Sequence, residues 1–258
     1  MTGAVRRVAL ASGLPVVLFS AWFVLTEGSQ NFYVPSLRTI LTAFADTWTP
    51  DRLRADVLPS LLRLAAGYAL AVVVGVALGL VIGTSPRIRA TCEPVLELFR
   101  AIPPPVLVPV IMLFAGIGDG MKVIVIVSGC VWPILLNTVE GVRAVDGVLS
   151  DTARSYRITG PARLRHLVLR GASPQIVTGM RQALSLAIIL MVISEMFAAS
   201  NGIGFSIVQF QRGFAIPEMW SGVILLGLLG FALSVLFGLA ERRILAWYSG
   251  LRGAQRQP

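Results

Sequence analysis

The stretch LAAGYALAVVVGVALGLVIG, residues 64–83, decides the fold of this chain because it runs for twenty positions without a charged side chain. About 20 apolar residues are enough for an α-helix to cross the ~30 Å hydrocarbon core of a membrane. Inside lipid only a helix satisfies its own backbone locally, and no alternating pattern of a barrel competes with it here. We therefore expect a membrane helix at this place.

Five further apolar runs predict the same structure. The predicted spans are residues 8–25, 58–83, 90–115, 121–142, 176–198 and 219–240. The composition agrees, since 55% of the 258 residues are hydrophobic and only 14% are charged, against roughly 25% charged in soluble domains. The sequence predicts an all-α polytopic membrane protein of six transmembrane helices, forming a single domain over residues 1–258.

The first run has an alternative interpretation. Arg6-Arg7 followed by an apolar segment could be a signal peptide. The segment is long, however, and residues 26–30 offer no small-x-small cleavage site, so we interpret it as the first span.

Basic residues are distributed unevenly between the two sides of the membrane. Of the 22 Lys and Arg residues, fourteen lie at the span ends that share a side with both termini, five lie at the opposite ends, and three lie within spans. Cytoplasmic ends carry the excess of basic residues. The sequence therefore predicts a multi-pass protein of the plasma (inner) membrane with both termini in the cytoplasm.

Several classes of function find no support in the sequence. The net charge of +9 would suit nucleic-acid binding, but the basic residues lie in loops between apolar runs, so we expect no nucleic acid partner. Cys92, Cys130 and the only histidine, His166, form no metal-ligand pattern. The only lysine, Lys122, follows Met121, so the chain cannot hold the Gly-Lys-Ser/Thr of a P-loop.

Small residues and short polar segments indicate local structure. Gly75, Gly79 and Gly83 share one helix face, where small residues let membrane helices approach closely; this face is compatible with a homodimer contact. Loop 26–57 contains Ile40, Leu41, Phe44 and Trp48 in a helical pattern after Ser36, which predicts a short amphipathic surface helix with Ser36 as its N-cap. The glycine-rich segment 201–204 suits either a turn at the mouth of a pathway or an ordinary loop.

The segment 146–174 between the fourth and fifth spans carries the most information. Leu149, Ala153 and Tyr156 fall at helical spacing, and Ser150 or Asp146 can cap the helix start. Thr159-Gly160-Pro161 then breaks the chain and permits a restart, with proline in a first-turn position. We expect a short exposed helix, a sharp turn and a second helix leading into the fifth span, an arrangement that a partner could push as a lever.

The motifs of this segment and of the spans resemble those of permease subunits of binding-protein-dependent ABC importers, in particular the sulfonate/taurine/nitrate branch. The resemblance covers nearly the whole chain and rests on the order of its motifs. They are Ser60-Leu61-Leu62-Arg63 with Gly67, Arg100-Ala101-Ile102-Pro103, Gly116-Ile117-Gly118, Asp151 to Tyr156, Pro174-Gln175-Ile176, Gly179-Met180-Arg181, Ser194-Glu195-Met196 and Asn201-Gly202-Ile203-Gly204.

Four positions depart from the family pattern. Asp151 replaces the usual Glu, Thr152 the usual Ala, Arg157 the usual Gly and Arg170 the usual Pro. These changes bear on the turn after the exposed helix more than on its docking role.

The resemblance implies the type I importer permease fold and a transport subunit without its own ATPase site or cofactor, with ATP and Mg²⁺ held by a partner ATPase. The implied partners are a second permease copy, two cytoplasmic ATPase subunits and an extracytoplasmic substrate-binding protein, besides the lipid bilayer. The segment 146–174 would dock on the ATPase. The implied coupling residues are Asp151, Thr152, Ala153, Arg154, Ser155, Tyr156, Arg157 and Gly160.

Charged residues inside spans are costly and face protein or a water-filled cavity. Arg63 and Glu195 lie near the outer end, whereas Glu97, Arg100, Glu140 and Arg181 lie nearer the cytoplasm, so both layers hold both signs. Pairing within each layer is one interpretation. The other is that Arg63 or Arg100 attracts a small anionic solute. The translocation pathway would then comprise Arg63, Arg100, Ser128, Asn137, Met191, Ser194 and Glu195.

Two other functions remain open at this point. An ion-coupled carrier would transport without an ATPase, although no internal repeat is evident. A membrane-embedded enzyme would need a nucleophile–base pair or a metal cluster within the spans, and the sequence shows neither.

Overall fold

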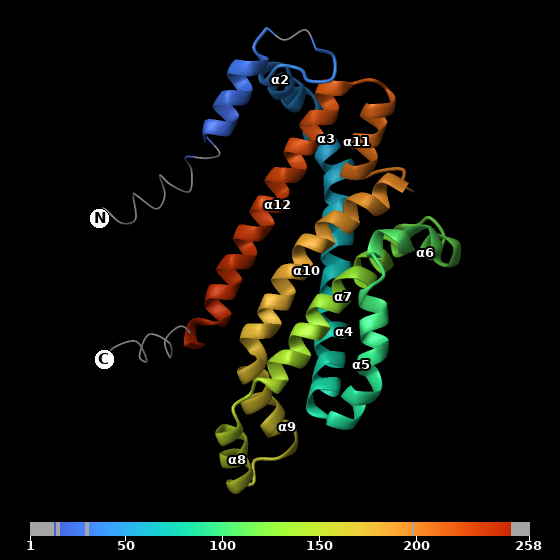
Figure 1. Cartoon of the computed structure of the whole chain (residues 1–258). Helices are drawn as coiled ribbons and strands as arrows, with labels where there is room; N and C mark the ends of the chain where they lie inside the picture. The colour runs from blue at the N-terminus through green and yellow to red at the C-terminus, as the bar shows by residue number, and fades with distance from the viewer. Residues whose placement is uncertain (1–12, 14–15, 29–30, 198, 249–258) are drawn as a thin grey trace, which may run out of the picture.

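The computed structural model describes residues 13, 16–28, 31–197 and 199–248, which form helices and connections with no strand among them. The all-α prediction is therefore confirmed. The molecule is elongated, with helix α8 (Gly147–Ser155) at one end and helix α2 (Leu37–Thr47) at the other (Figure 1). We refer to these as the α8 end and the α2 end.

Four helices in the described part of the chain are long and apolar enough to cross a membrane. Their cores are α4 (Leu58–Thr84), α7 (Asp119–Arg143), α10 (Leu169–Phe197) and α12 (Ile216–Ile244). Two of them are lengthened at their starts through single π-helical turns, α4 by α3 (Pro50–Arg52) and α10 by α9 (Gly160–Arg163). These helices overlap the predicted spans 58–83, 121–142, 176–198 and 219–240.

The predicted span 90–115 is not one continuous helix. Helix α5 (Pro86–Arg100) ends, the chain turns through Pro104–Val106, and α6 (Leu107–Ala115) continues at an angle of 74°. Pro103, Pro104 and Pro105 have no backbone N–H, so they cannot extend the hydrogen-bond ladder of α5. The prediction of an unbroken helix was wrong because it weighed apolar length and neglected the three prolines.

The described part of the predicted first span is the apolar helix Val16–Thr26, and residues 1–12, 14 and 15 lie outside the description. With the bent α5–α6 pair counted as one span, the described residues supply up to five candidate spans. A total of six spans stays a prediction.

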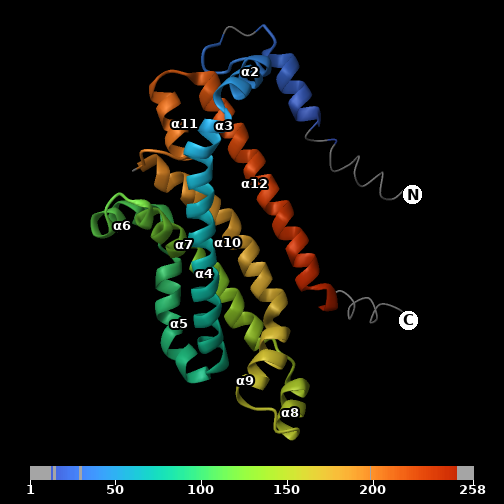
Figure 2. The ribbon, with the colours of Figure 1, turned by 180° about the vertical axis from the view of Figure 1, so that it is seen from behind.

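Helix α7 packs between α4 and α10 at the centre of the molecule (Figures 1 and 2). The glycine face of α4 lies directly against α7, because a Cβ added at Gly79 would come within 2.5 Å of the Thr138 Cβ. Gly67, Gly75 and Gly83 make equally close approaches. This glycine face, which the sequence made compatible with a homodimer contact, therefore packs against another helix of the same chain. We call the face formed by Gly67, Gly75, Gly79 and Gly83 the glycine seam.

The second side of α7 contacts α10 in the same manner. A Cβ at Gly179 of α10 would meet the carbonyl oxygen of Pro133 at 2.7 Å, and one at Gly141 of α7 would meet that of Ala172 at 2.9 Å. Small residues thus bring three membrane helices to backbone contact, which is the main source of helix association where lipid is as apolar as the side chains.

The α2 end is closed by shorter helices. Ser36 caps α2, its Oγ accepting the N–H of Thr39, so the predicted amphipathic helix and its cap are confirmed. Trp48 is buried and its Nε1 donates to Ser221 Oγ of α12 at 3.1 Å. Helix α11 (Ile203–Arg212) packs between α10 and α12. All the buried residues of α12 fall within its first ten positions.

The glycine seam can be tested by Gly79→Ala. The added methyl group would have to displace Thr138, and overpacking of this kind costs about 1–3 kcal/mol. We expect a lower thermal unfolding midpoint for the purified protein in detergent. Gly227→Ala in α12 is the matched control, since a Cβ there meets nothing within 4 Å. Equal midpoints for the two variants would contradict close packing at the seam.

Candidate functional site

Helix α8 is capped as the sequence predicts. Asp146 is the N-cap, and its Oδ1 accepts the backbone N–H groups of Val148 at 2.7 Å and Leu149 at 3.1 Å. Of the residues at helical spacing, Ala153 is buried, whereas Leu149 and Tyr156 are 56% and 77% exposed. The helix therefore uses Ala153 to rest on the bundle and presents larger apolar groups outward.

The turn after α8 requires a left-handed residue, and Arg157 supplies it with φ of 55°. The N–H of Ile158 donates to the Ala153 carbonyl at 2.8 Å and that of Arg157 to the Arg154 carbonyl at 3.0 Å. This is the Schellman arrangement, whose left-handed position is usually glycine. The Gly-to-Arg departure thus leaves the turn geometry intact, although a left-handed non-glycine residue costs roughly 1–2 kcal/mol.

The Pro-to-Arg departure at Arg170 falls at the start of α10. Arg170 retains its backbone N–H, and a single helical run extends from Gly160 to Phe197. This run begins at Gly160, which has φ of 59°. The remaining coupling candidates Asp151, Thr152, Arg154 and Ser155 are all exposed on α8. The segment is a helix–turn–helix that projects from the bundle at the α8 end (Figure 1).

A second group of charged residues lies buried toward the α2 end. Arg63 of α4 is 5% exposed, and its Nη1 donates to Glu195 Oε1 of α10 at 2.8 Å. Its Nε donates to Asp119 Oδ1 of α7 at 2.8 Å, and its Nη2 to the side chain of Asn201 at 2.5 Å. The guanidinium therefore joins the three central helices at one point, which we call the Arg63 cluster.

Glu195 also holds the start of α11. Its Oε1 accepts from Ser60 Oγ at 2.7 Å, and its Oε2 accepts the N–H of Gly204 at 3.0 Å. Gly202 has φ of 121°, and a Cβ there would fall 2.5 Å from the Glu195 carboxyl carbon. The glycine-rich segment is thus a tight wrap around a buried carboxylate at a helix N-terminus, where negative charge is stabilised.

The hypothetical pathway residues separate into three environments. Met191, Ser194 and Glu195 are buried in helix packing together with Arg63. Ser128 is half-buried and its hydroxyl donates to the Val125 carbonyl of its own helix. The remaining two, Arg100 and Asn137, line one cavity.

This cavity of about 390 Å³ lies where α5 breaks, facing α7 and α10. Its polar groups are Arg100 at the end of α5, Asn137 of α7 and Gln182 of α10. Asn137 Nδ2 donates to Gln182 Oε1 at 3.2 Å, and Arg100 pairs with Glu97 at 2.7 Å. Trp132 adds an aromatic wall and stacks on Phe99 with ring centroids 5.6 Å apart. We call it the helix-break cavity.

Prolines remove helical hydrogen-bond donors from the backbone around the break. The residues three, four and five positions after Arg100 are prolines, so no helical donor can reach its carbonyl oxygen. Pro133 likewise removes the helical donor for the carbonyl of Gly129, another lining residue. Non-helical backbone at membrane depth is tolerated where it is buried in protein or lines a water-filled cavity.

Several members of both sites were not predicted from the sequence. Trp132 and Gln182 belong to the helix-break cavity, and no charge or spacing singles them out within apolar helices. Asp119 and Asn201 belong to the Arg63 cluster. Their polarity at the edge of a span was a usable signal, but their convergence on Arg63 depends on the tertiary packing of α4, α7 and α10. Within the described ranges, no three His, Cys, Asp or Glu side chains come together as a metal site.

The Arg63 cluster predicts non-additive effects of substitution. Arg63→Gln leaves Glu195 fully buried without its closest positive charge, and breaking a buried pair costs about 3–5 kcal/mol. We expect a large fall in thermal unfolding midpoint and in yield of folded protein. The double variant Arg63→Gln/Glu195→Gln should be more stable than Arg63→Gln alone.

Asp119→Asn is the control for this prediction, because its side chain is 70% exposed and exposed pairs contribute little. Its midpoint should fall only slightly. If the double variant lost as much stability as the two single variants combined, Arg63 and Glu195 would be energetically independent.

The comparisons with known proteins agree with this geometry. Residues 71–246 match the family described as binding-protein-dependent transport system inner membrane component. The taurine transport system permease protein TauC of Escherichia coli (strain K12) is 26% identical, covering 94% of this chain and 91% of its own length. The nitrate import permease protein NrtB of Synechocystis is 29% identical, covering 84% and 82%.

A solved structure shows the same fold. The inward-facing MetNI methionine ABC transporter aligns with a TM-score of 0.63 at 19% identity, covering 74% of this chain and 95% of that chain. The type I importer permease fold is thereby confirmed, and the ion-coupled carrier and the membrane-embedded enzyme are set aside. The chain belongs to the binding-protein-dependent transport system inner membrane components, as a non-catalytic permease subunit of an ABC importer whose ATPase is a separate subunit.

Proposed function

We propose that this permease carries a small anionic solute of the sulfonate, taurine or nitrate class. We further propose that the helix-break cavity binds this solute on the translocation pathway. The observation that carries the proposal is the placement of Arg100, Asn137 and Gln182 around the break of a membrane helix. Discontinuous membrane helices commonly form substrate sites in transporters. The cavity volume also falls in the range of roughly 300–1,000 Å³ typical of small-molecule pockets.

The chemistry of the cavity suits this class of solute. The Arg100 guanidinium can donate two parallel hydrogen bonds to a sulfonate or nitrate, and the amides of Asn137 and Gln182 can donate or accept. Taurine also carries an ammonium group, for which the carbonyl oxygen of Arg100, with no helical donor, is a suitable acceptor. The Arg63 cluster has no such role in the proposal, since its donors are already taken by Glu195, Asp119 and Asn201.

The proposed assembly contains two copies of this permease, two ATPase subunits and an extracytoplasmic substrate-binding protein. Both termini and the α8 end face the cytoplasm, where most of the basic residues lie. ATP, bound with Mg²⁺ by the partner subunits, closes the ATPase pair. The α8 segments then move with it, and the paired permeases rock from inward- to outward-facing to receive the solute. Capping by Asp146 and the Schellman turn make α8 stiff enough to transmit this motion.

Arg100→Gln tests whether the helix-break cavity binds the solute. We expect uptake by the reconstituted transporter to fall about tenfold at limiting solute, the loss of one charge-assisted contact, while assembly and basal ATP hydrolysis are retained. Arg143→Gln is the matched control, since Arg143 also pairs with a glutamate three residues earlier, at 2.7 Å, but lies at the end of α7. Equal uptake by the two variants would exclude Arg100 from the path.

Tyr156→Ala tests the coupling role of α8. Large exposed side chains anchor protein interfaces, and Tyr156 is 77% exposed. We expect less ATPase subunit to co-purify and less solute-stimulated ATP hydrolysis. Tyr33→Ala is the control, because this tyrosine is 68% exposed at the α2 end and should leave the ATPase attached. Full retention of the ATPase by Tyr156→Ala would place the docking surface elsewhere.

A further inference from the structure

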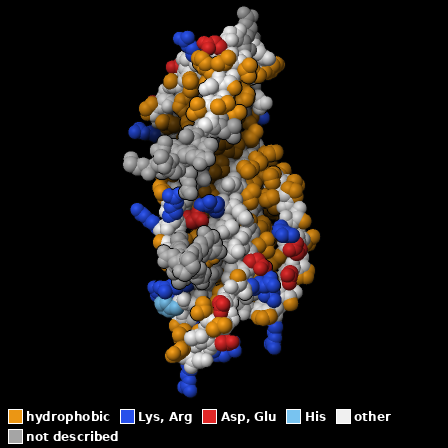
Figure 3. Space-filling view, turned by 60° about the vertical axis from the view of Figure 1, so that its left-hand side comes forward, with side chains coloured by type: hydrophobic (Ala, Val, Ile, Leu, Met, Phe, Trp, Pro, Cys, Tyr) orange, Lys and Arg blue, Asp and Glu red, His pale blue; other side chains and the backbone are white. Residues whose placement is uncertain are grey.

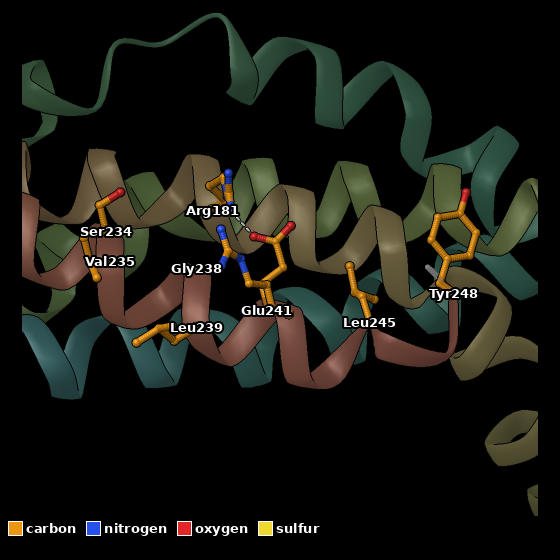
Figure 4. Close-up of a pocket in the computed structure, with 9 residues that line it drawn as sticks. Arg181, Ser234, Val235, Gly238, Leu239, Glu241, Leu245 and Tyr248 are labelled. Carbon is orange, nitrogen blue, oxygen red and sulfur yellow. Dashed lines mark hydrogen bonds and ion pairs between the residues drawn. The ribbon is translucent and has the colours of Figure 1, made fainter. Parts of the chain in front are cut away.

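A second cavity lies between α10 and α12, in the half of the molecule toward the α8 end. It has a volume of about 490 Å³ and combines charged with apolar walls. Arg181 reaches into it from α10 and Glu241 from α12, and the two side chains point toward each other (Figure 4). Val235 and Leu239 form an apolar strip along α12. We call it the α10–α12 groove.

The groove carries an excess of positive charge. Arg181 and Glu241 form an ion pair across it, and the Arg181 guanidinium also lies over the Phe237 ring, 5.9 Å from its centroid. Arg242 is a further lining residue and forms no ion pair within the described residues. Of the three charged groups, Glu241 compensates one arginine, so one positive charge remains. Basic side chains are more numerous over this half of the surface (Figure 3).

The length of α12 sets the depth of the groove. Its 29 residues extend roughly 44 Å at 1.5 Å per residue, which exceeds the ~30 Å hydrocarbon core. Glu241 and Arg242 in its last turn therefore lie at the level of the headgroups, while Val235 and Leu239 lie within the acyl chains. The polar and apolar walls are thus ordered as in a phospholipid.

We propose that the α10–α12 groove binds an anionic phospholipid, with its phosphate at Arg242 and Arg181 and an acyl chain along Val235 and Leu239. Basic pockets between membrane helices are known to accept anionic headgroups, and arginine matches phosphate in geometry. A free phosphate would satisfy the same cations but leave the apolar strip empty. The bound lipid fills the groove between α10 and α12 and holds the two helices together. This inference does not depend on which solute is carried.

The test uses the complete transporter reconstituted into vesicles of phosphatidylcholine with phosphatidylglycerol as the minor lipid and then extracted in detergent. Native mass spectrometry counts the retained lipids. We expect selective retention of phosphatidylglycerol by the wild type and an about fivefold loss in Arg242→Gln, the effect of one basic residue near the surface. Arg242→Lys should keep most of the lipid.

Arg243→Gln is the matched control, since it removes the neighbouring arginine of α12, which does not line the groove. It should retain phosphatidylglycerol as the wild type does. Equal losses in Arg242→Gln and Arg243→Gln would overturn the proposal by showing general charge attraction. A second arm compares the thermal unfolding midpoint in three samples. They are pure phosphatidylcholine nanodiscs, the same nanodiscs with inorganic phosphate, and nanodiscs that also contain phosphatidylglycerol. A rise with phosphate equal to that given by phosphatidylglycerol would overturn the lipid assignment in favour of a free anion.

Discussion

The contact of α7 with both α4 and α10 is the constraint on which the rest of the structure depends. In lipid there is no hydrophobic gain from joining two apolar helices, so association relies on close van der Waals contact. Glycines on α4 and α10 allow this contact at backbone distance. Once these three helices are fixed, Arg63, Asp119 and Glu195 meet at one end, and Asn137 and Gln182 meet near the helix break. Both polar sites are thus consequences of one packing arrangement.

Much of this fold follows from the sequence because the relevant physics is local. Apolar length predicts α4, α7, α10 and α12, and side-chain capping predicts the starts of α2 at Ser36 and of α8 at Asp146. The bend after Arg100 was also encoded locally, in three successive prolines. The predicted span 90–115 rested on the length of the apolar run and took no account of these prolines. The partners of residues that pack against distant parts of the chain could not be predicted from the sequence. Nothing near Gly79 shows that its neighbour is Thr138 rather than a second copy, and nothing near Gln182 shows that it faces Asn137.

The arginines within spans illustrate why residue type alone does not define a role. Arg63 is enclosed, and its donors are directed at three fixed partners. Arg100 is 59% exposed and bonded to a glutamate of its own helix, so its guanidinium can change partners at little cost. Arg181 pairs with Glu241 of another helix beside a cavity. Enclosure suits a structural role, whereas exposure beside a cavity suits a ligand that comes and goes.

The Arg63 cluster also has a consequence for how the chain enters the membrane. Asp119 follows Arg63 by 56 residues and Glu195 follows it by 132. At ~5–20 residues per second, the ribosome completes Glu195 roughly 7–26 s after Arg63. An arginine at the centre of an isolated helix raises the free energy of insertion by about 2.5–3.5 kcal/mol on translocon scales. Arg63 lies near the first turns of α4 and not at its centre, so this cost is an upper bound for it, and it acquires its two acidic partners only after α7 and then α10 have been made.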